Sequence, residues 1–278
     1  MILLDFHSVI IAHLMISFQL EESFTFNEDL MRHRILYSLA KYKGQFQRDY
    51  GKLVISCDGL DYWRRKEFPF YKAKRRENKE ASEIDWKEID AFMNKIKAEL
   101  AQYMPYPVIE VEGAESDDII GTIVRHIRDT PLLIMSRDKD FKQLQRYPNV
   151  KQYDAIGERF IICEDPKRQL FEMICKGDVS DGIPNVVSPE NSFVNGIRQK
   201  PMTQKKMDRW FEESKIDPEV KDRFKMNRML IDLSQTPEEL QQKILVKLKS
   251  EINKPRPNVL NYFMKYNLSS LIGDVQNF

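Results

Sequence analysis

The feature that most constrains the fold of this chain is a series of short apolar runs separated by helical stretches. The runs are rich in leucine or β-branched residues and cover residues 2–5, 52–58, 107–113 and 131–138, with a weaker fifth run at 159–163. Helical periodicity lies between them, over residues 27–50, 85–103 and 117–128. Short buried strands that alternate with helices predict an α/β domain with a mainly parallel central sheet.

The length and composition of the chain bound its organisation. With 278 residues, 42% of them hydrophobic, it can form one elaborate domain or a main domain with a smaller one. We predict an α/β core over 1–163, which includes a basic segment at about 60–85, then a helical region over 164–254, and a linker and tail over 255–278. No apolar run is long enough to span a bilayer, and the N-terminus does not read as a signal peptide. The three cysteines make no disulfide framework, which indicates a reducing, cytoplasmic compartment.

Acidic residues gather where the predicted strands end. Asp5, Asp58 and Asp138 each end a strand, and the carboxyl ends of parallel strands meet at the edge of the sheet where ligands bind. Further acids follow in nearby loops and first turns: Glu115, Asp117, Asp118, Asp140, Asp178 and Asp181. Helix capping is an alternative for Asp118. Nine carboxylates cannot converge without compensation, and all-oxygen ligands suit Mg²⁺ or Mn²⁺. Two such ions about 4 Å apart can hydrolyse a phosphodiester.

A basic and aromatic segment follows Asp58. Residues 61–80 hold eight Lys or Arg residues, with five aromatic residues interleaved, although the net charge of the whole chain is only +1. Basic residues bind phosphates and aromatic rings stack on unpaired bases, so the segment suggests contact with single-stranded nucleic acid. A solvated helix face whose aromatic side chains pack on the core is the alternative.

The order and spacing of these motifs resemble a known family. The motifs are "LLDFH", "CDGLDYWRRKEFPFYKAKR", "AESDDI", "SRDKDFKQL", "KGDVSDGIPNV" and "NRMLIDL". The chain resembles the 5′ nuclease superfamily of flap endonucleases and 5′-3′ exonucleases, and within it the ribonuclease H branch of T-even-type bacteriophages. The resemblance implies a PIN-like core, a basic helical arch, and a helical C-terminal region with a helix-hairpin-helix-like element that binds duplex DNA.

The resemblance also implies roles for individual residues. The first of two Mg²⁺ ions, for which Mn²⁺ can substitute, would be surrounded by Asp5, Asp58, Asp117 and Asp138. The second would be served by Asp140, Asp178 and Asp181, with Glu115 and Asp118 in support. Tyr71, Lys72 and Arg75 would meet the scissile phosphate, and Asp117 is counted with them as catalytic. The expected DNA contacts are Arg64, Arg65, Lys72, Lys74, Arg75 and Arg76 in the arch, and Lys200, Lys205 and Lys206 beyond it. A monovalent ion is implied near 178–186, and the stretch that follows this turn is poorer in glycine than the hairpin of many family members.

The resulting hypothesis is a Mg²⁺-dependent nuclease that removes 5′ flaps and RNA primers and acts at nicks in lagging-strand replication. The alternatives are an RNA-directed PIN-like nuclease, which is usually shorter, and a non-catalytic DNA-junction-binding protein, which gains nothing from the acids. Expected partners are DNA, a single-stranded-DNA-binding protein and a sliding clamp on which the C-terminal tail could dock; packing of the tail on its own domain is the alternative. We expect a monomer without membrane contact, in the host cytoplasm if the chain is viral.

Overall fold

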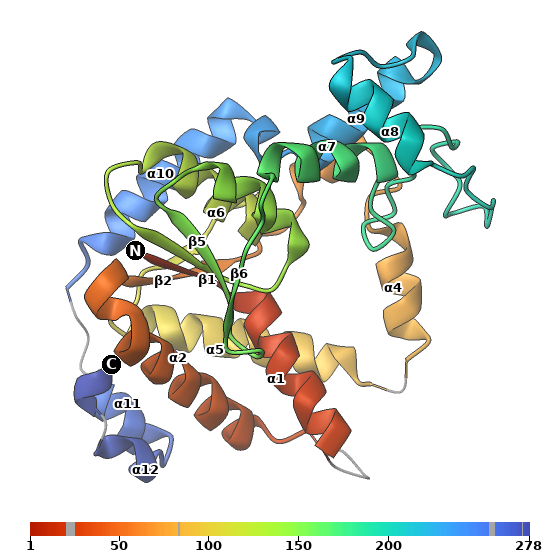
Figure 1. The fold of residues 1–278 in the computed structure, drawn as a ribbon. Helices are drawn as coiled ribbons and strands as arrows, with labels where there is room; N and C mark the ends of the chain where they lie inside the picture. The colour runs from red at the N-terminus through yellow and green to blue at the C-terminus, as the bar shows by residue number, and fades with distance from the viewer. Residues whose placement is uncertain (21–25, 83, 256–258, 274) are drawn as a thin grey trace.

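A six-stranded sheet lies at the centre of the computed structural model of this chain (Figure 1). The structure describes residues 1–20, 26–82, 84–255, 259–273 and 275–278. The strands are β1 (Ile2–Asp5), β2 (Leu53–Cys57), β3 (Val108–Glu110), β4 (Leu132–Met135), β5 (Val150–Asp154) and β6 (Arg159–Ile161). They are arranged in the order β3-β2-β1-β4-β5-β6, and all neighbours except β5 and β6 run parallel. The prediction of a mainly parallel sheet is confirmed.

One edge of the sheet differs from the prediction. The run at 159–163 was expected to form a buried parallel strand, but β6 pairs antiparallel with β5 and is largely exposed. Only the short connection 155–158 separates the two strands, and a parallel pair needs a crossover of a dozen residues or more. The sequence pattern also missed β5, because the tyrosine and charged residues of "VKQYD" mask its apolar character.

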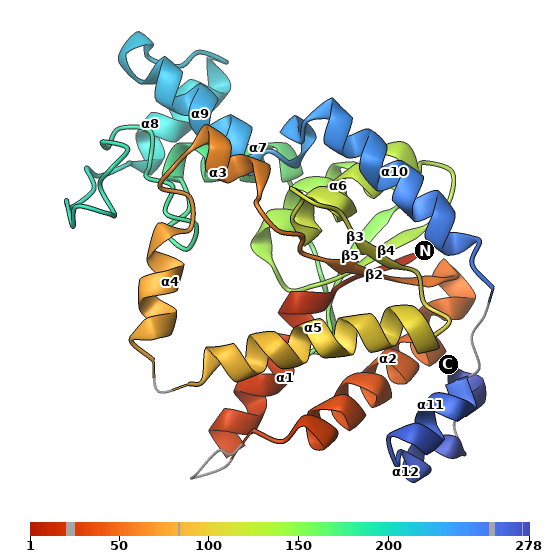
Figure 2. The same cartoon turned by 180° about the vertical axis from the view of Figure 1, so that it is seen from behind.

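Side chains of the central strands alternate between two cores. Ile2 and Leu4 of β1 point into the larger core, whereas Leu3 points into the second. The first core lies under α1 (Phe6–Leu20), α2 (Glu28–Tyr50) and α5 (Trp86–Tyr103), and the second under α6 (Ser116–His126) and α10 (Glu238–Ile252) (Figures 1 and 2). Helix α1 was not predicted, because "FHSVIIAHLMISFQL" is apolar nearly all round and lacks helical amphipathicity.

A smaller helical unit follows the sheet. It contains α7 (Pro166–Lys176), α8 (Gln204–Glu212) and α9 (Lys221–Ile231), together with the short 3₁₀ helices η2 (Pro218–Val220) and η3 (Leu233–Gln235). Trp210 and Val220 are buried within it. Helix α10 then returns to the sheet, where Leu240, Ile244 and Leu248 pack in the second core. The predicted helical region 164–254 therefore combines this unit with a helix of the α/β core.

The C-terminal segment packs on its own domain. Helices α11 (Val259–Lys265) and α12 (Ser269–Ile272), with η4 (Val275–Asn277), lie beside α2 (Figure 1). Tyr262, Phe263 and Phe278 are buried in the first core, and the Tyr262 hydroxyl donates a 2.6 Å hydrogen bond to Glu99. Of the two roles expected for the tail, packing on its own domain is the one that these aromatic residues have.

The basic segment forms two short helices that project from the sheet. They are α3 (Trp63–Glu67) and α4 (Ala73–Glu80), and α4 stands apart from the core above the start of α5 (Figure 2). This is the arrangement expected of an arch over the sheet edge. Among the described helices, none is both long and apolar enough to cross a membrane.

Candidate active site

The carboxyl ends of the central strands open into one acidic cavity of about 490 Å³. Asp5 ends β1, Asp58 follows β2, Asp117 lies in the first turn of α6, and Asp138 caps the 3₁₀ helix η1 (Lys139–Arg146) after β4. All of the predicted acids except Asp118 line this cavity: Asp5, Asp58, Glu115, Asp117, Asp138, Asp140, Asp178 and Asp181. Residues up to 176 positions apart in the sequence are thus brought to one edge of the sheet.

The floor of the cavity carries more negative charge than the protein itself neutralises. Burial and the nearby Asp58 and Asp138 raise the pKa of Asp5 to about 7. Burial and neighbouring carboxylates, Asp138 first among them, also hold the pKa values of Asp117 and Asp140 well above their usual range. One oxygen of Asp140, Oδ1, is buried and has no hydrogen-bond partner among the described residues.

These properties fit hard divalent cations. The donor atoms are all oxygen, which suits Mg²⁺ or a similar ion. Such an ion would also relieve the mutual repulsion of the carboxylates and give the buried Asp140 oxygen a partner. No three of the described His, Cys, Asp and Glu side chains form a ready-made ligand set in this conformation.

Asp178 and Asp181, two of the three acids predicted for the second ion, are held in a tight turn. Asp178 Oδ1 accepts hydrogen bonds from the backbone N–H and the hydroxyl of Ser180, at 2.7 and 2.5 Å. Lys139 Nζ lies 2.7 Å from Asp178 Oδ2. Burial acts to raise the pKa of Asp178, but Lys139 and the Ser180 hydroxyl outweigh it, so the net pKa is lowered. Asp178 is thus an anion already balanced by Lys139, whose side chain is 53% exposed.

The arch cations meet this turn directly. Arg75 Nη2 lies 2.6 Å from Asp181 Oδ1, and the backbone N–H of Lys72 donates a 2.8 Å bond to the Asp181 carbonyl. Lys72 Nζ bonds Glu115 and lies 3.8 Å from Asp181 Oδ1. Lys72 and Arg75 both line the acidic cavity, as predicted for residues that meet a phosphate there. Their carboxylate partners keep them at its mouth.

Two predicted roles at the base of the arch are corrected, one of an arch residue and one of a residue of α6. Arg64 was expected to contact DNA and Asp118 to serve a metal ion, but they are 2% and 0% exposed and bond each other. Arg64 Nη1 and Nη2 donate to the two Asp118 oxygens, each at 2.8 Å. The Trp63 indole and the Thr236 hydroxyl also donate to Asp118. With its oxygens taken, Asp118 faces away from the cavity and holds the arch base to α6.

Tyr71 also differs from its predicted role. It was expected to meet the scissile phosphate, but only 4% of it is exposed, and it does not line the cavity. Its hydroxyl lies 2.8 Å from Glu115 Oε2 and 3.0 Å from Asp181 Oδ2. Burial and both carboxylates keep the pKa of Tyr71 well above its usual range, so it is a hydrogen-bond donor. Tyr71 supports the acids rather than the substrate.

The remaining residues predicted to contact DNA differ in how exposed their side chains are. Arg65 and Lys74 of the arch are exposed, as are Lys200 and Lys205 in the helical unit. Lys206 is partly covered, 3.5 Å from Asp217 and over the Trp210 ring. The side chain of Arg76 lies outside the described ones.

Other cavity residues were missed from the sequence. Arg137 and Lys139 flank Asp138 in "SRDKDF", and this alternation of signs was the available signal. Lys79, Trp86 and His7 also line the cavity. Ser136 links two of the acids, since its hydroxyl donates to Asp5 at 3.2 Å and accepts from the Asp138 N–H at 3.2 Å.

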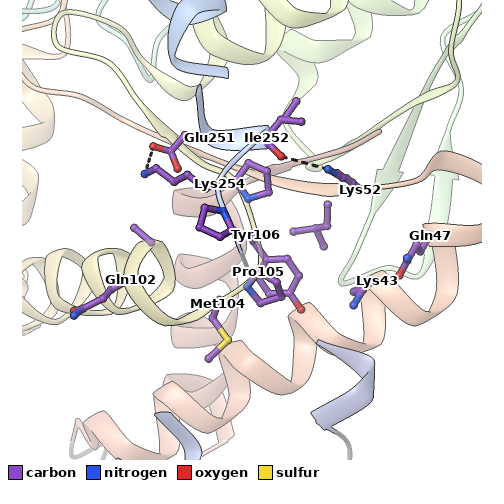
Figure 3. A pocket seen from close by; sticks show the side chains of 14 residues that line it. Lys43, Gln47, Lys52, Gln102, Met104, Pro105, Tyr106, Glu251, Ile252 and Lys254 are labelled. Atoms are coloured by element: carbon purple, nitrogen blue, oxygen red, sulfur yellow. Dashed lines mark hydrogen bonds and ion pairs between the residues drawn. The ribbon is translucent and has the colours of Figure 1, made fainter. Parts of the chain in front are cut away.

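A second cavity, of about 220 Å³, has different chemistry (Figure 3). It lies where β2 and β3 begin, at the opposite edge of the sheet, and Leu53 and Pro107 line it. Its lining includes one acid, Glu251, which lies 2.5 Å from Lys254 Nζ. The cavity at the carboxyl edge is therefore the candidate active site.

The fold and this site define a class: an α/β nuclease core with carboxylates at the strand ends and a basic arch above them. A family model described as the 5′-3′ exonuclease N-terminal resolvase-like domain matches residues 1–171, and a model described as T4 RNase H, C terminal, matches 165–278. The chain belongs to the 5′-3′ exonuclease family. It is similar to ribonuclease H of Enterobacteria phage T4, with 29% identity over 99% of this chain and 95% of that protein.

Solved structures show the same fold. The flap endonuclease D15 of bacteriophage T5, solved as a pseudo-enzyme-product complex with DNA and metal ions, gives a TM-score of 0.61 at 15% identity, over 91% of this chain and 99% of that one. The T5 5′-exonuclease with bound zinc gives 0.60 at 17% identity, over the same shares. The predictions of a PIN-like fold and of membership among the 5′ nucleases are confirmed.

Proposed function

We propose that this chain is a divalent-metal-dependent, structure-specific 5′ nuclease. Its substrates would be 5′ flaps, nicked duplexes and RNA primers on DNA, and its place lagging-strand replication in the cytoplasm of a phage-infected cell. The observation that carries the proposal is the convergence of eight carboxylates in one cavity whose mouth holds Lys72 and Arg75. Carboxylates that repel each other and phosphate are useful to a nuclease, because bound metal ions turn the cluster into a site that binds the phosphate of the substrate.

Two Mg²⁺ ions would bind in the cavity, with Mn²⁺ as a substitute. Asp5, Asp58, Asp117 and Asp138 would hold the first, and the second would be held by Asp140, Asp178 and Asp181. When bound, such ions activate water and neutralise the leaving oxygen of a phosphodiester.

The side chains of the arch would position the phosphate. Lys72 is paired with Glu115 and Arg75 with Asp181. Both cations would exchange these carboxylates for the non-bridging oxygens of the scissile phosphate and pair with them again after cleavage. The buried tyrosine Tyr71 keeps Glu115 and Asp181 aligned through its hydroxyl.

Exposed lysines of the helical unit, Lys200 and Lys205, would contact duplex phosphates, and a monovalent ion near 178–186 belongs to the same proposal.

Cleavage of a 5′-labelled flap in Mg²⁺ tests this function. The Asp138→Asn substitution should reduce the rate about 100-fold or more, because it removes a ligand charge from the cavity. Asp222→Asn is the matched control, since the Asp222 side chain is 98% exposed outside the cavity. EDTA should abolish cleavage by the wild type.

The same assay separates the alternatives. Junction binding that is equal with Mg²⁺ and EDTA, without cleavage, would favour a non-catalytic binder. Cleavage of RNA alone would favour an RNA-directed nuclease. Wild-type rates for Asp138→Asn would contradict the role of the acidic cavity in cleavage.

The proposed assembly is a monomer that also contacts a single-stranded-DNA-binding protein and a sliding clamp.

A further inference from the structure

The acidic cavity has a second wall of different chemistry. Ile11, Ala12 and Met15 of α1 and Trp86 at the start of α5 line it, and Met15 is 38% exposed. The cavity thus joins a charged end to an apolar, aromatic one. A nucleotide has the same two parts, since its phosphate is charged and its base is a flat ring.

Hydrogen bonds and core packing position the Trp86 ring. Its indole N–H donates a 2.7 Å hydrogen bond to the Ser82 hydroxyl, which itself donates to the Lys79 carbonyl at 2.9 Å. The partly buried ring also packs against the larger core. A rigid aromatic side chain loses little conformational entropy when a base stacks on it, which favours binding.

Lys79 places a cation beside this ring. Its Nζ is 4.8 Å from the Trp86 ring centroid and 3.1 Å from both carboxylate oxygens of Asp90. The Lys79 and Asp90 side chains are 39% and 50% exposed, and exposed ion pairs are weak, so a phosphate can replace Asp90. Lys79 is also one helical turn beyond Arg75 on the same face of α4. The two cations lead from the mouth of the acidic site to Trp86.

We propose that Trp86 is a stacking platform for an unpaired base of the 5′ strand and that Lys79 contacts the phosphate of the same nucleotide. This inference rests on the proposed nuclease function and adds a substrate-binding residue to it. Stacking at Trp86 holds the single strand at a fixed distance from the carboxylates. The residue reads the presence of an unpaired base without reading its identity, because every base has a π-face.

Tryptophan fluorescence tests the contact directly, in EDTA and therefore without turnover. The other two tryptophans, Trp63 and Trp210, are 8% and 0% exposed and do not line the cavity. A single-stranded oligonucleotide should quench the emission of the wild type and leave that of Trp86→Phe unchanged. A strand of equal length with abasic 5′ positions should bind without quenching. Quenching by the abasic strand, or in Trp86→Phe, would overturn the inference.

Affinity gives the second measurement, by anisotropy of a 3′-labelled strand. Trp86→Leu should weaken binding of the normal strand by roughly five-fold or more and leave binding of the abasic strand unchanged. Lys79→Met should weaken both. Tyr37→Leu is the matched control, because Tyr37 is an aromatic residue of α2 that is 56% exposed outside the cavity. An equal loss of affinity for the normal strand and the abasic strand in Trp86→Leu would contradict stacking.

Cleavage separates this inference from the proposed function. Flap cleavage by Trp86→Leu should show a raised KM with kcat retained, since the carboxylates are intact. A wild type that binds and is quenched but does not cleave in Mg²⁺ would overturn the nuclease function and leave the stacking site standing.

Discussion

Asp117 and Asp118 are neighbours in the sequence and have opposite environments. Asp117 faces the acidic cavity, where burial and Asp138 raise its pKa, whereas Asp118 is fully buried and bonded to Arg64. Successive residues of an α-helix point about 100° apart, so the first turn of α6 sends one acid to the site and the other into the core. A count of acids in the sequence cannot make this distinction.

Removal of the buried arginine tests the correction at Arg64. Arg64→Ala leaves the charge of Asp118 buried without its partner, and we expect a loss of about 3–5 kcal/mol in the free energy of unfolding. Arg65→Ala is the control, since Arg65 is exposed on the same helix and should change stability by less than about 0.5 kcal/mol. Urea unfolding of both variants measures the difference. A stable Arg64→Ala with weakened DNA binding would restore the DNA-contact role.

Asp117→Asn should separate stability from activity. The raised pKa means that the ionised form is the unfavourable one, so loss of the charge should stabilise the metal-free protein near pH 8. The same substitution should lower the rate of flap cleavage. Urea unfolding in EDTA, beside the rate in Mg²⁺, gives both quantities. A destabilised Asp117→Asn would show that repulsion in the cavity is already relieved.

At the scale of elements, the turn after α7 and the base of the arch form one unit. Gly182 has φ of +73°, and a Cβ atom there would lie 2.9 Å from the carbonyl oxygen of Phe70. The same turn accepts the N–H of Lys72 at the Asp181 carbonyl. Lys72 itself has φ of +56°, a strained conformation for a residue with a side chain. The close approach therefore fixes where Lys72 and Asp181 meet.

Gly182→Ala should disrupt this unit. The clash with Phe70 and the positive φ together predict a loss of about 1–3 kcal/mol in stability and at least about a tenfold loss of flap cleavage. Gly196→Ala has the same positive φ, at +63°, but nothing within 4 Å of the added Cβ. It should lose about 1 kcal/mol of stability or less and keep its activity. Equal activity losses in the two variants would argue against a contact effect.

Helix α11 is held to the domain by a buried polar network. Glu99 accepts from Tyr262 at 2.6 Å and from Arg32 Nε at 2.9 Å, and all three side chains are buried. Tyr262→Phe removes one donor and should lower the free energy of unfolding by about 1–2 kcal/mol. Tyr37→Phe, at an exposed tyrosine, should be neutral. Thermal melts of the two variants measure the contribution of the C-terminal segment; an unchanged Tm in Tyr262→Phe would mean that the segment is held by apolar packing alone.

At the scale of the whole molecule, the acidic cavity makes stability depend on pH and metal. The pKa of Asp5 is about 7 in the folded chain and about 3.9 when unfolded, so the folded state holds an extra proton between these values. Stability in EDTA should therefore fall as the pH rises from about 4 through about 7. Asp117 and Asp140 act in the same direction. Glu115 and Asp178, whose pKa values are lowered, oppose this only at acid pH.

Divalent ions should remove this dependence. Mg²⁺ replaces the protons and should raise the Tm most above about pH 7, where the carboxylates repel each other. Thermal melts from about pH 5 to about pH 8.5, in EDTA and in Mg²⁺, provide the measurement. Asp5→Asn should flatten the EDTA profile. A Tm in EDTA that is constant or rises with pH would contradict the pKa of Asp5.

Much of the fold and the set of acids followed from the sequence because both depend on local patterns. Apolar runs predict strands, and an aspartate at the end of a parallel strand must lie at the carboxyl edge whatever surrounds it. Asp5, Asp58 and Asp138 were therefore placed correctly at one cavity. Helix α1 and strand β5 were missed because neither has the periodicity of its class.

The tertiary structure alone decided which charges pair with each other. Arg64 and Arg75 have the same side chain in the same basic segment, yet one is buried on Asp118 and the other lies at the cavity mouth on Asp181. The buried C-terminal aromatic residues and the Trp86 wall depend on the same kind of contact. Local sequence determined the strands and the acids that end them. The partners of each side chain were set by packing between distant segments, which determines where a charge is desolvated and what lies beside it.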